Sequence, residues 1–272
     1  MSRRILVTGA ASGLGLALVR RFATSQDRVL ASDLDVSCDV LPQGVDYLRL
    51  DVREDRDWEA ARDLVATRWG GLDILVNNAG VAAGGRIDLV TMQEWSRVTE
   101  INLFGVVRGC HTFARMFKDQ RSGHIVNIAS IAGLVHPPGM ASYNATKAAV
   151  VALSETLSHE LAPYDVCTSV VCPSFFRTNL ASSLRGSDKD VESKAAQLIN
   201  NSPLTADDIA EEVVLGIEQR EPLILADVGA RAAYQQKLGD REAYDAQMAA
   251  TALRAFEREE ALGSAGREGT ES

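Results

Sequence analysis

The hydrophobic positions of this chain follow two alternating patterns. Short, almost continuously apolar runs alternate with longer stretches in which apolar residues recur at helical spacing. Runs of the first kind are typical of strands buried on both faces of a parallel sheet, and stretches of the second kind are typical of amphipathic helices. We expect strands at residues 3–8, 28–33, 45–50, 72–77, 124–129, 166–172 and 222–226, and helices at residues 13–23, 55–69, 91–118, 142–161 and 206–219.

This alternation predicts an α/β fold with a doubly wound, mostly parallel, Rossmann-like sheet of about seven strands and helices on both faces. The connection between the second and third strands is short and contains Pro42 and Gly44, so any helix there is stunted. No linker or repeat interrupts the pattern. We therefore interpret residues 1–262 as a single domain.

Two segments stand apart from the strand–helix pattern. Residues 174–203 are a long polar and small-residue stretch, and such a length predicts a mobile lid over a binding site. Phe175 and Phe176 open it, and they either form an apolar inner face or pack the lid onto the body. Residues 227–262 form a charged helical extension that could cover the lid or a subunit surface, and residues 263–272 are expected to be disordered. The extension has a partial apolar stripe of Tyr234, Leu238, Tyr244, Met248, Leu253 and Phe256.

Composition and charge exclude several classes of function. A net charge of −9 argues against non-specific nucleic-acid binding. No apolar run reaches the roughly 18 residues of a membrane span, and the N-terminus enters a strand without a signal peptide, so we expect a cytoplasmic protein. The four cysteines form no Cys-x-x-Cys pair, which favours free buried thiols and predicts no metal site.

A glycine-rich turn joins the first strand to the first helix at Thr8-Gly9-Ala10-Ala11-Ser12-Gly13-Leu14-Gly15. Glycines there let the backbone approach a diphosphate, whose charge is stabilised by the helix N-terminus. The spacing differs from the common GxGxxG pattern, and such a turn can also be only a turn. With the helix that follows, the turn predicts nucleotide binding by Gly9, Ser12, Gly13, Leu14 and Gly15.

Asp33 ends the second strand, where a dinucleotide fold places the acid that accepts hydrogen bonds from the adenosine ribose. Its carboxylate would repel a 2′-phosphate, and no Arg or Lys stands at position 12 or 34 to offset that repulsion. This position therefore predicts NAD (NADH) in preference to NADP.

Tyr143 and Lys147 lie four residues apart in a predicted helix and therefore on one face of it. A phenol has a pKa of about 10, and a nearby ammonium lowers it. Such a phenol can donate and accept a proton near neutral pH, as general acid–base catalysis requires. Taken alone, the pair could also be surface neighbours.

The ordered motifs resemble those of the short-chain dehydrogenase/reductase family, in its short single-domain branch. Four of them match in sequence: the glycine-rich turn, Asn77-Asn78-Ala79-Gly80 after the fourth strand, Ser130 after the fifth, and Tyr143 with Lys147 on the next helix. The resemblance covers roughly residues 3–226. It implies an oxidoreductase that interconverts a secondary alcohol and a ketone by hydride transfer with NAD(H).

The resemblance also implies a role for each matched residue. Tyr143 exchanges a proton with the substrate, while Lys147 lowers the phenol pKa and holds the nicotinamide ribose. Ser130 stabilises the substrate oxygen, and Asn102 links Lys147 to solvent through its backbone carbonyl and a water. Taken alone, Ser130 could be a helix cap and Asn102 a residue that bonds its own helix. Further cofactor contacts are implied for Asp51, Val52, Asn78, Ala79, Gly80, Pro173 and Thr178.

Several expectations depart from the family pattern or lie outside it. Ser174 stands where relatives usually have glycine, so the turn there could differ. Residues 131–140 and 174–203 flank the site and favour a small-molecule substrate with apolar substituents, whereas His136 is expected to be merely exposed. The alternatives are a 3-oxoacyl thioester reductase and a non-catalytic nucleotide-sensing protein. Helices 91–118 and 142–161 are expected to pair subunits into a homodimer or homotetramer.

Overall fold

Seven parallel strands form one sheet in the order β3-β2-β1-β4-β5-β6-β7 in the computed structural model, whose described backbone covers residues 2–34 and 40–268. The chain starts in the middle of the sheet, builds outward to β3, and then returns to place β4 on the other side of β1. This reversal creates the crevice where open α/β sheets bind ligands. The predicted doubly wound sheet is confirmed. The strands are β1 Arg4–Thr8, β2 Arg28–Asp33, β3 Asp46–Arg49, β4 Ile74–Asn77, β5 Gly123–Ile128, β6 Val166–Val171 and β7 Leu223–Ile224.

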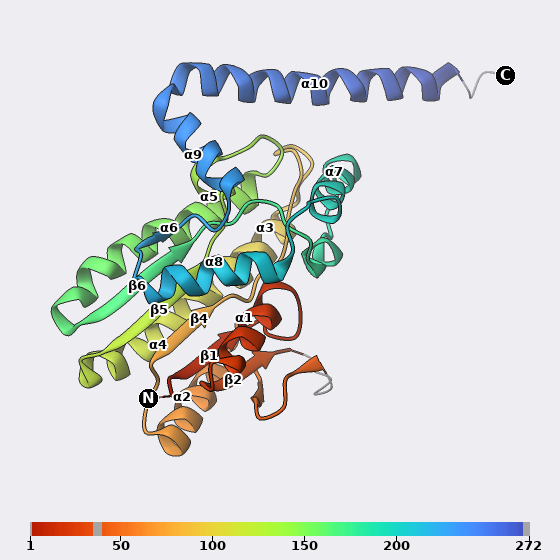
Figure 1. Ribbon diagram of the computed structural model, residues 1–272. Helices are drawn as coiled ribbons and strands as arrows, with labels where there is room; N and C mark the ends of the chain where they lie inside the picture. The colour runs from red at the N-terminus through yellow and green to blue at the C-terminus, as the bar shows by residue number, and fades with distance from the viewer. Residues whose placement is uncertain (1, 35–39, 269–272) are drawn as a thin grey trace.

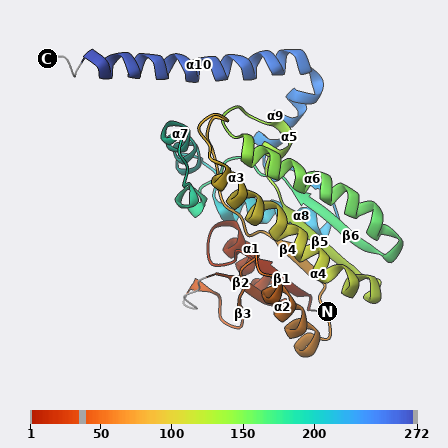
Figure 2. The ribbon, with the colours of Figure 1, turned by 180° about the vertical axis from the view of Figure 1, so that it is seen from behind.

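Helices cover both faces of the sheet because successive strand residues point to opposite sides. In β1, Ile5 and Val7 belong to one core cluster and Leu6 to the other, and all three are fully buried. One face packs on α1 Gly13–Thr24 and α8 Ala206–Glu218, and the other packs on α2 Asp55–Trp69, α4 Gly105–Gln120 and α6 Ala141–Leu161 (Figures 1 and 2).

The helix expected at residues 91–118 is divided into three parts by a turn of π-helix. Helix α3 spans Met92–Thr99, the π-helical turn η2 spans Glu100–Phe104, and α4 follows directly. The spacing of apolar residues does not distinguish a π turn from an α turn, since the turn changes the register by a single residue. Turns of this kind are frequent at functional sites, and this one contains Asn102.

The segment between β6 and α8 contains more regular structure than its composition predicts. A short 3-10 helix, η4 Asn179–Ser183, is followed by α7 Lys189–Asn200. Asp188 caps α7 by accepting from Val191 N at 3.3 Å, and its buried carboxylate also pairs with Arg86 at 2.7 Å. These bonds dock the segment onto the body. Its role as a lid remains a prediction.

The C-terminal extension is helical, as expected, and continues beyond the predicted end. Helix α9 spans Val228–Gly239 and α10 spans Arg241–Glu268, so residues 263–268 are helical rather than disordered. Residues 269–272 lie outside the described chain. Figures 1 and 2 show α10 projecting past the body from the tip of α9.

Only part of the apolar stripe on this extension contacts the body. Tyr244 is buried, and Tyr234 and Met248 pack against the same core cluster. Leu238 and Leu253 are exposed. The sixth residue of the stripe, Phe256, lies outside the described side chains, which end at residue 254.

The remaining helices are α5 Ala132–Val135 and the 3-10 turn η3 Ala162–Tyr164. Cys110 and Cys172 are buried free thiols and Cys167 is a half-buried one, while Cys38 lies outside the described residues. Across residues 2–34 and 40–268, no helix is both long and apolar enough to span a bilayer.

Candidate active site

A cleft of about 650 Å³ opens where β1, β4 and β5 end, at the crevice created by the strand order. Gly15 and Asn102 lie behind its wall rather than on it. The other predicted site residues all line it: Gly9, Ser12, Gly13, Leu14, Asp33, Asp51, Val52, Asn78, Ala79, Gly80, Ser130, Tyr143, Lys147, Pro173 and Thr178.

The glycine-rich turn owes its shape to two different requirements. Gly9 and Gly13 have φ values of 65° and 52°, which favour glycine. A Cβ at Gly13 would collide with the Thr178 hydroxyl, and one at Gly15 would collide with the Gly9 carbonyl. Gly9 and Gly15 are therefore both needed for close packing, since a Cβ on Gly9 would lie 2.7 Å from the Cα of Ala79. This cradle fits a diphosphate.

The turn after β4 is tied to the glycine-rich turn by a network of hydrogen bonds. Thr8 Oγ1 accepts from Asn78 N at 3.0 Å and from Ala79 N at 3.1 Å. Asn78 Nδ2 in turn donates to Thr8 O at 2.8 Å and to Gly9 O at 3.1 Å. The Asn78 side chain thus braces the two loops that form the middle of the cleft.

At the end of the cleft beyond β2, Asp33 is held by backbone amides. Its Oδ2 accepts from Ala11 N at 2.9 Å and its Oδ1 accepts from Leu34 N at 2.7 Å. The two hydrogen bonds hold both carboxylate oxygens in place. Asp33 therefore presents its charge to the cleft in a fixed orientation.

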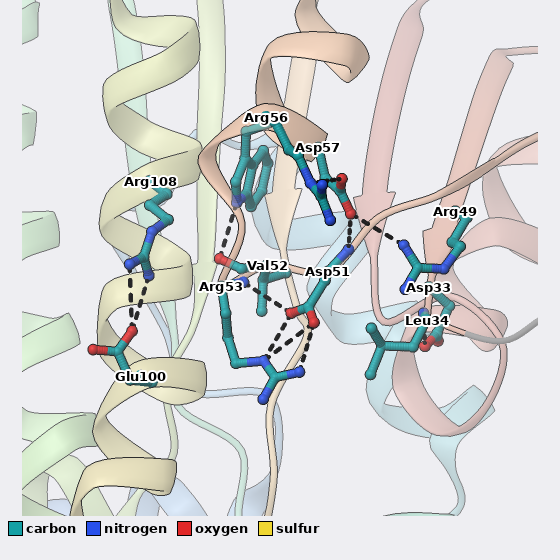
Figure 3. Close-up of polar contacts among 11 residues, drawn as sticks. Asp33, Leu34, Arg49, Asp51, Val52, Arg53, Arg56, Asp57, Glu100 and Arg108 are labelled. Atoms are coloured by element: carbon teal, nitrogen blue, oxygen red, sulfur yellow. Dashed lines mark hydrogen bonds and ion pairs between the residues drawn. The ribbon is translucent and has the colours of Figure 1, made fainter.

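The arginines around this end each have a carboxylate partner (Figure 3). Arg53 binds Asp51 at 2.6 Å, and the hydrogen bond from Arg53 holds the Asp51 pKa below its usual range. Arg49 binds Asp57 at 3.3 Å. Both guanidinium groups are therefore already paired with a carboxylate, and neither is an unpaired cation available to a phosphate.

The opposite end of the cleft brings together the three residues expected to perform catalysis. Tyr143 and Lys147 project from the first turns of α6 and are both buried, and the Lys147 Nζ lies 5.8 Å from the centre of the Tyr143 ring. Lys147 Nζ donates to Ile128 O at 2.8 Å. The Ser130 hydroxyl, which accepts from Ala132 N at 3.2 Å, is hydrogen-bonded to the Tyr143 phenol.

Burial is the largest influence on the pKa of Tyr143, and its acidification by Lys147 stays a prediction. Burial raises the pKa of Tyr143 to about 12, although the hydrogen bond from Ser130 opposes this shift. Burial also lowers the pKa of Lys147 to about 8. The loss of water around each charged form is the largest cause of both shifts. Tyr143 is therefore protonated at neutral pH.

Asn102 lies behind the wall of the cleft and supports a loop that lines it. It is fully buried, its Oδ1 accepts from Val81 N at 2.8 Å, and its Nδ2 donates to Val81 O at 2.9 Å. The π turn therefore fixes the chain just beyond Gly80, which lines the cleft.

Sequence reasoning missed several residues at the end of the cleft beyond Tyr143. Arg97 and Ile101 line it from α3 and the π turn, one turn apart. Their spacing of four residues places both on one face of the predicted helix, but it does not show that this face lines the cleft. The lid segment and α7 contribute Arg185, Ala195 and Ile199, beside Leu180 and Leu184, which the sequence favours as part of an apolar inner face of the lid.

Ser174, the departure from the family pattern, is explained by the C-terminal extension. Its backbone N donates to Asp227 Oδ2 at 2.8 Å and its hydroxyl donates to Asp227 Oδ1 at 2.7 Å. Asp227 also caps α9. A glycine at position 174 would lack the second of these bonds.

The other loop that flanks the site is also held by the extension. Tyr244 OH donates to Val135 O at 2.6 Å. Lys237 Nζ donates to Leu134 O and lies 3.0 Å from Nδ1 of His136, which is exposed as expected.

Residues 3–189 match the sequence model of the short chain dehydrogenase family. The 3-alpha-(or 20-beta)-hydroxysteroid dehydrogenase of Mycobacterium tuberculosis is 34% identical over 178 residues, which cover 64% of this chain and 68% of that protein. A short chain dehydrogenase/reductase from Burkholderia phymatum, solved in complex with NAD, is 30% identical with a TM-score of 0.83 and covers 89% of this chain and 94% of its own.

Another solved relative holds the phosphorylated cofactor. The closed form of a serine dehydrogenase complexed with NADP+ is 29% identical, with a TM-score of 0.71 over 78% of this chain and 87% of its own. Relatives thus differ in cofactor while sharing the fold. From the family match, the relatives and the sheet order together, we conclude that this chain belongs to the short-chain dehydrogenase/reductase family of oxidoreductases.

Proposed function

We propose that this protein is an NAD(H)-dependent oxidoreductase that interconverts a secondary alcohol and a ketone. One observation carries the proposal: the buried phenol of Tyr143 and the half-buried hydroxyl of Ser130, with Lys147 beside them, line the same cleft as the glycine-rich turn. A dinucleotide laid from Asp33 to Lys147 would bring its reactive end to the phenol. Burying these polar side chains costs free energy, which favours a chemical role over a packing role.

The cofactor supplies or accepts the hydride when it is bound. The backbone of Gly9 and Gly13, which line the cleft, would hold the diphosphate, and Asp33 would hold the adenosine ribose. Lys147, anchored on the Ile128 carbonyl, would reach the second ribose with its remaining hydrogens.

The substrate oxygen would sit between the hydroxyls of Ser130 and Tyr143. In ketone reduction, Tyr143 gives its proton to the carbonyl oxygen as hydride arrives at carbon, and Ser130 donates a hydrogen bond to the developing charge. Because Tyr143 is protonated at neutral pH, the resting centre is prepared for reduction. Alcohol oxidation requires the phenol to lose its proton first and should be favoured by alkaline pH.

The preference for NAD rests on the charges around Asp33. A 2′-phosphate would approach a carboxylate held by two backbone amides. To bind the phosphate, Arg49 would have to leave Asp57, or Arg53 would have to leave Asp51. The same feature counts against a 3-oxoacyl thioester reductase, which usually uses NADPH.

A single substitution tests the catalytic centre. Tyr143→Phe should lower kcat by about two to four orders of magnitude, because it removes the proton donor, and should leave NADH binding nearly unchanged. Ketone reduction is followed by NADH absorbance, and binding by NADH fluorescence. Tyr164→Phe, which removes a hydroxyl from the η3 turn outside the cleft, is the matched control.

Turnover retained in Tyr143→Phe would refute the assignment. Tight NADH binding with no turnover of any alcohol or ketone in the parent protein would instead favour the nucleotide-sensing alternative. The ratio of kcat/KM for NAD and NADP on the parent protein tests the cofactor assignment, which a clear NADP preference would overturn.

A further inference from the structure

The two ends of the cleft differ in charge. Beyond β2 the charged lining residues are Asp33, Asp51 and Arg53, which include both signs. Toward Tyr143 and the lid segment they are Lys147, Arg97 and Arg185. Within the described chain, no Asp or Glu lines this second end, so its charge is positive only.

Arg97 is a half-buried side chain that no carboxylate neutralises in the described part of the chain. Its guanidinium lies 3.4 Å from the carbonyl oxygen of Ser183. The Ser183 hydroxyl in turn accepts from Ala82 N at 2.8 Å, and the adjacent Val81 is fixed by Asn102. These contacts place Arg97 beside the loop that continues from Gly80, at the catalytic end of the cleft.

Arg185 approaches from the lid segment, two residues beyond Ser183, and is exposed. Glu94 and Glu192 lie near the adjacent Gly186, but both have other partners. Glu94 binds the Thr91 backbone at 2.6 Å, and Glu192 binds Lys189 at 3.0 Å. No ion pair joins Arg185 to either of them in the described structure.

Apolar side chains form the rest of this end of the cleft. They come from the turn before α6, the lid segment and α7, and are Met140, Phe175, Phe176, Leu180, Leu184 and Ile199. A substrate that fits this wall has an apolar body, and its remaining recognition group should be negative. Arginine is the side chain that best binds a planar or tetrahedral oxyanion by paired hydrogen bonds.

We propose that the substrate is an apolar ketone or alcohol that carries a terminal organic anion, a carboxylate or a sulfonate, and that Arg97 and Arg185 bind this anion. The inference rests on the proposed function and specifies its substrate class. Arg97 supplies the fixed contact from the body of the protein. Arg185 adds a second contact from the lid segment and links anion binding to the position of that segment.

Three matched sets of substrates test the proposal. The first set is levulinate and longer keto acids that end in a methyl ketone, the second is their methyl esters, and the third is the corresponding keto sulfonates. The parent protein should reduce the acids with a kcat/KM about tenfold or more above the esters, since hydrogen bonds to a charged group contribute that much. The sulfonates distinguish the two kinds of anion.

Substitution at Arg97 should remove this preference. Arg97→Gln should lower kcat/KM for the acids by about tenfold through KM, and change the esters by no more than about twofold. Arg97→Lys should retain part of the preference, and Arg185→Gln should have a smaller effect because it is exposed. Arg115→Gln on α4 removes the same charge outside the cleft and should change nothing. Thermal unfolding checks that each variant is folded.

Esters reduced as well as acids by the parent protein, or an acid-to-ester ratio unchanged in both Arg97→Gln and Arg185→Gln, would overturn the inference. If neither acids nor esters turn over, their binding to the NADH complex is measured by NADH fluorescence, and acids that bind no better than esters overturn it as well. Neutral ketones reduced through Tyr143 without any acid preference would refute this inference alone. Activity retained in Tyr143→Phe would refute the proposed function and leave the acid preference measurable.

Discussion

At the scale of single residues, burial decides the protonation of several side chains more strongly than their charged neighbours do. His124 shows this outside the cleft. Its Nε2 lies 2.7 Å from Ser169 Oγ, and Ser169 donates its only hydroxyl hydrogen to Glu221 O at 2.6 Å. We therefore assign the shared hydrogen to His124 Nε2 from the bonding network. Burial lowers the pKa of His124 to about 4.

This depressed pKa predicts a loss of stability in mild acid. Between pH 6.5 and 4 the unfolded chain binds a proton at residue 124 that the folded chain does not, so the free energy of unfolding falls as the pH falls. The contribution lost between pH 7 and pH 5 is about 2 kcal/mol. Urea unfolding gives the free energy of unfolding at pH 7 and at pH 5. The difference between these two values should be about 2 kcal/mol smaller in His124→Gln than in the parent protein.

The exposed His111 on α4 provides the matched control, and His111→Gln should leave the difference between pH 7 and pH 5 unchanged. An equal pH dependence in His124→Gln and the parent protein would contradict the assignment.

At the scale of elements, the active-site loops depend on a helix that lies outside the strand–helix repeat. Asp227 caps α9 by accepting from Ala230 N at 2.8 Å, and the same carboxylate accepts two bonds from Ser174. It is 5% exposed. One side chain thus starts the C-terminal extension and shapes the turn that follows β6.

Removing this carboxylate should destabilise the protein more than removing an ordinary helix cap. Asp227→Ala should lower the free energy of unfolding by about 2–3 kcal/mol, since it leaves the half-buried Ser174 amide and the buried Ala230 amide without an acceptor. Ser174→Gly removes only the hydroxyl bond and should cost about 1 kcal/mol. Both are measured by urea unfolding.

Asp240→Ala is the control for helix capping alone, since Asp240 accepts from Ala243 N at 2.9 Å at an exposed helix start. If Asp227→Ala cost no more than Asp240→Ala, the coupling between the turn and the extension would be absent.

At the scale of the whole molecule, the C-terminal extension contacts the loops that flank the candidate active site. Asp227, Lys237 and Tyr244 hold the two loops that flank the substrate. Helices α4 and α6 lie on the face of the sheet shared with α2. Their outer surfaces are where we expect a second copy of the chain to bind.

We predict that the protein is a homodimer or homotetramer paired through these helices. Light scattering after size exclusion should give a mass of two or four times 29.3 kDa. Ala152 is a small exposed residue on α6, so Ala152→Arg should place a bulky charge in the interface and shift the mass toward a single chain. Arg115→Ala, which removes bulk from an exposed position of α4, should not shift it. A parent protein of 29.3 kDa would refute the prediction.

Much of the fold and of the candidate site could be predicted because both depend on local patterns of residues in the sequence. Apolar runs such as residues 3–8 and 124–129 marked strands that the structure places in the sheet core. The spacing of Tyr143 and Lys147 placed both on one face of a helix, and the structure shows that both line the cleft. The π turn at Glu100–Phe104 and helix α7 could not be predicted, because each depends on contacts with distant segments.

What the sequence determined by itself was the order of strands and helices, the family motifs and the side chains available for chemistry, since these follow from the identity and spacing of neighbouring residues. Tertiary structure alone decided that burial raises the pKa of Tyr143, that Ser174 binds Asp227, and that Arg97 and Arg185 line one apolar end of the cleft. Desolvation, hydrogen bonding and charge balance depend on which distant residues surround a group, and only the folded chain determines those surroundings.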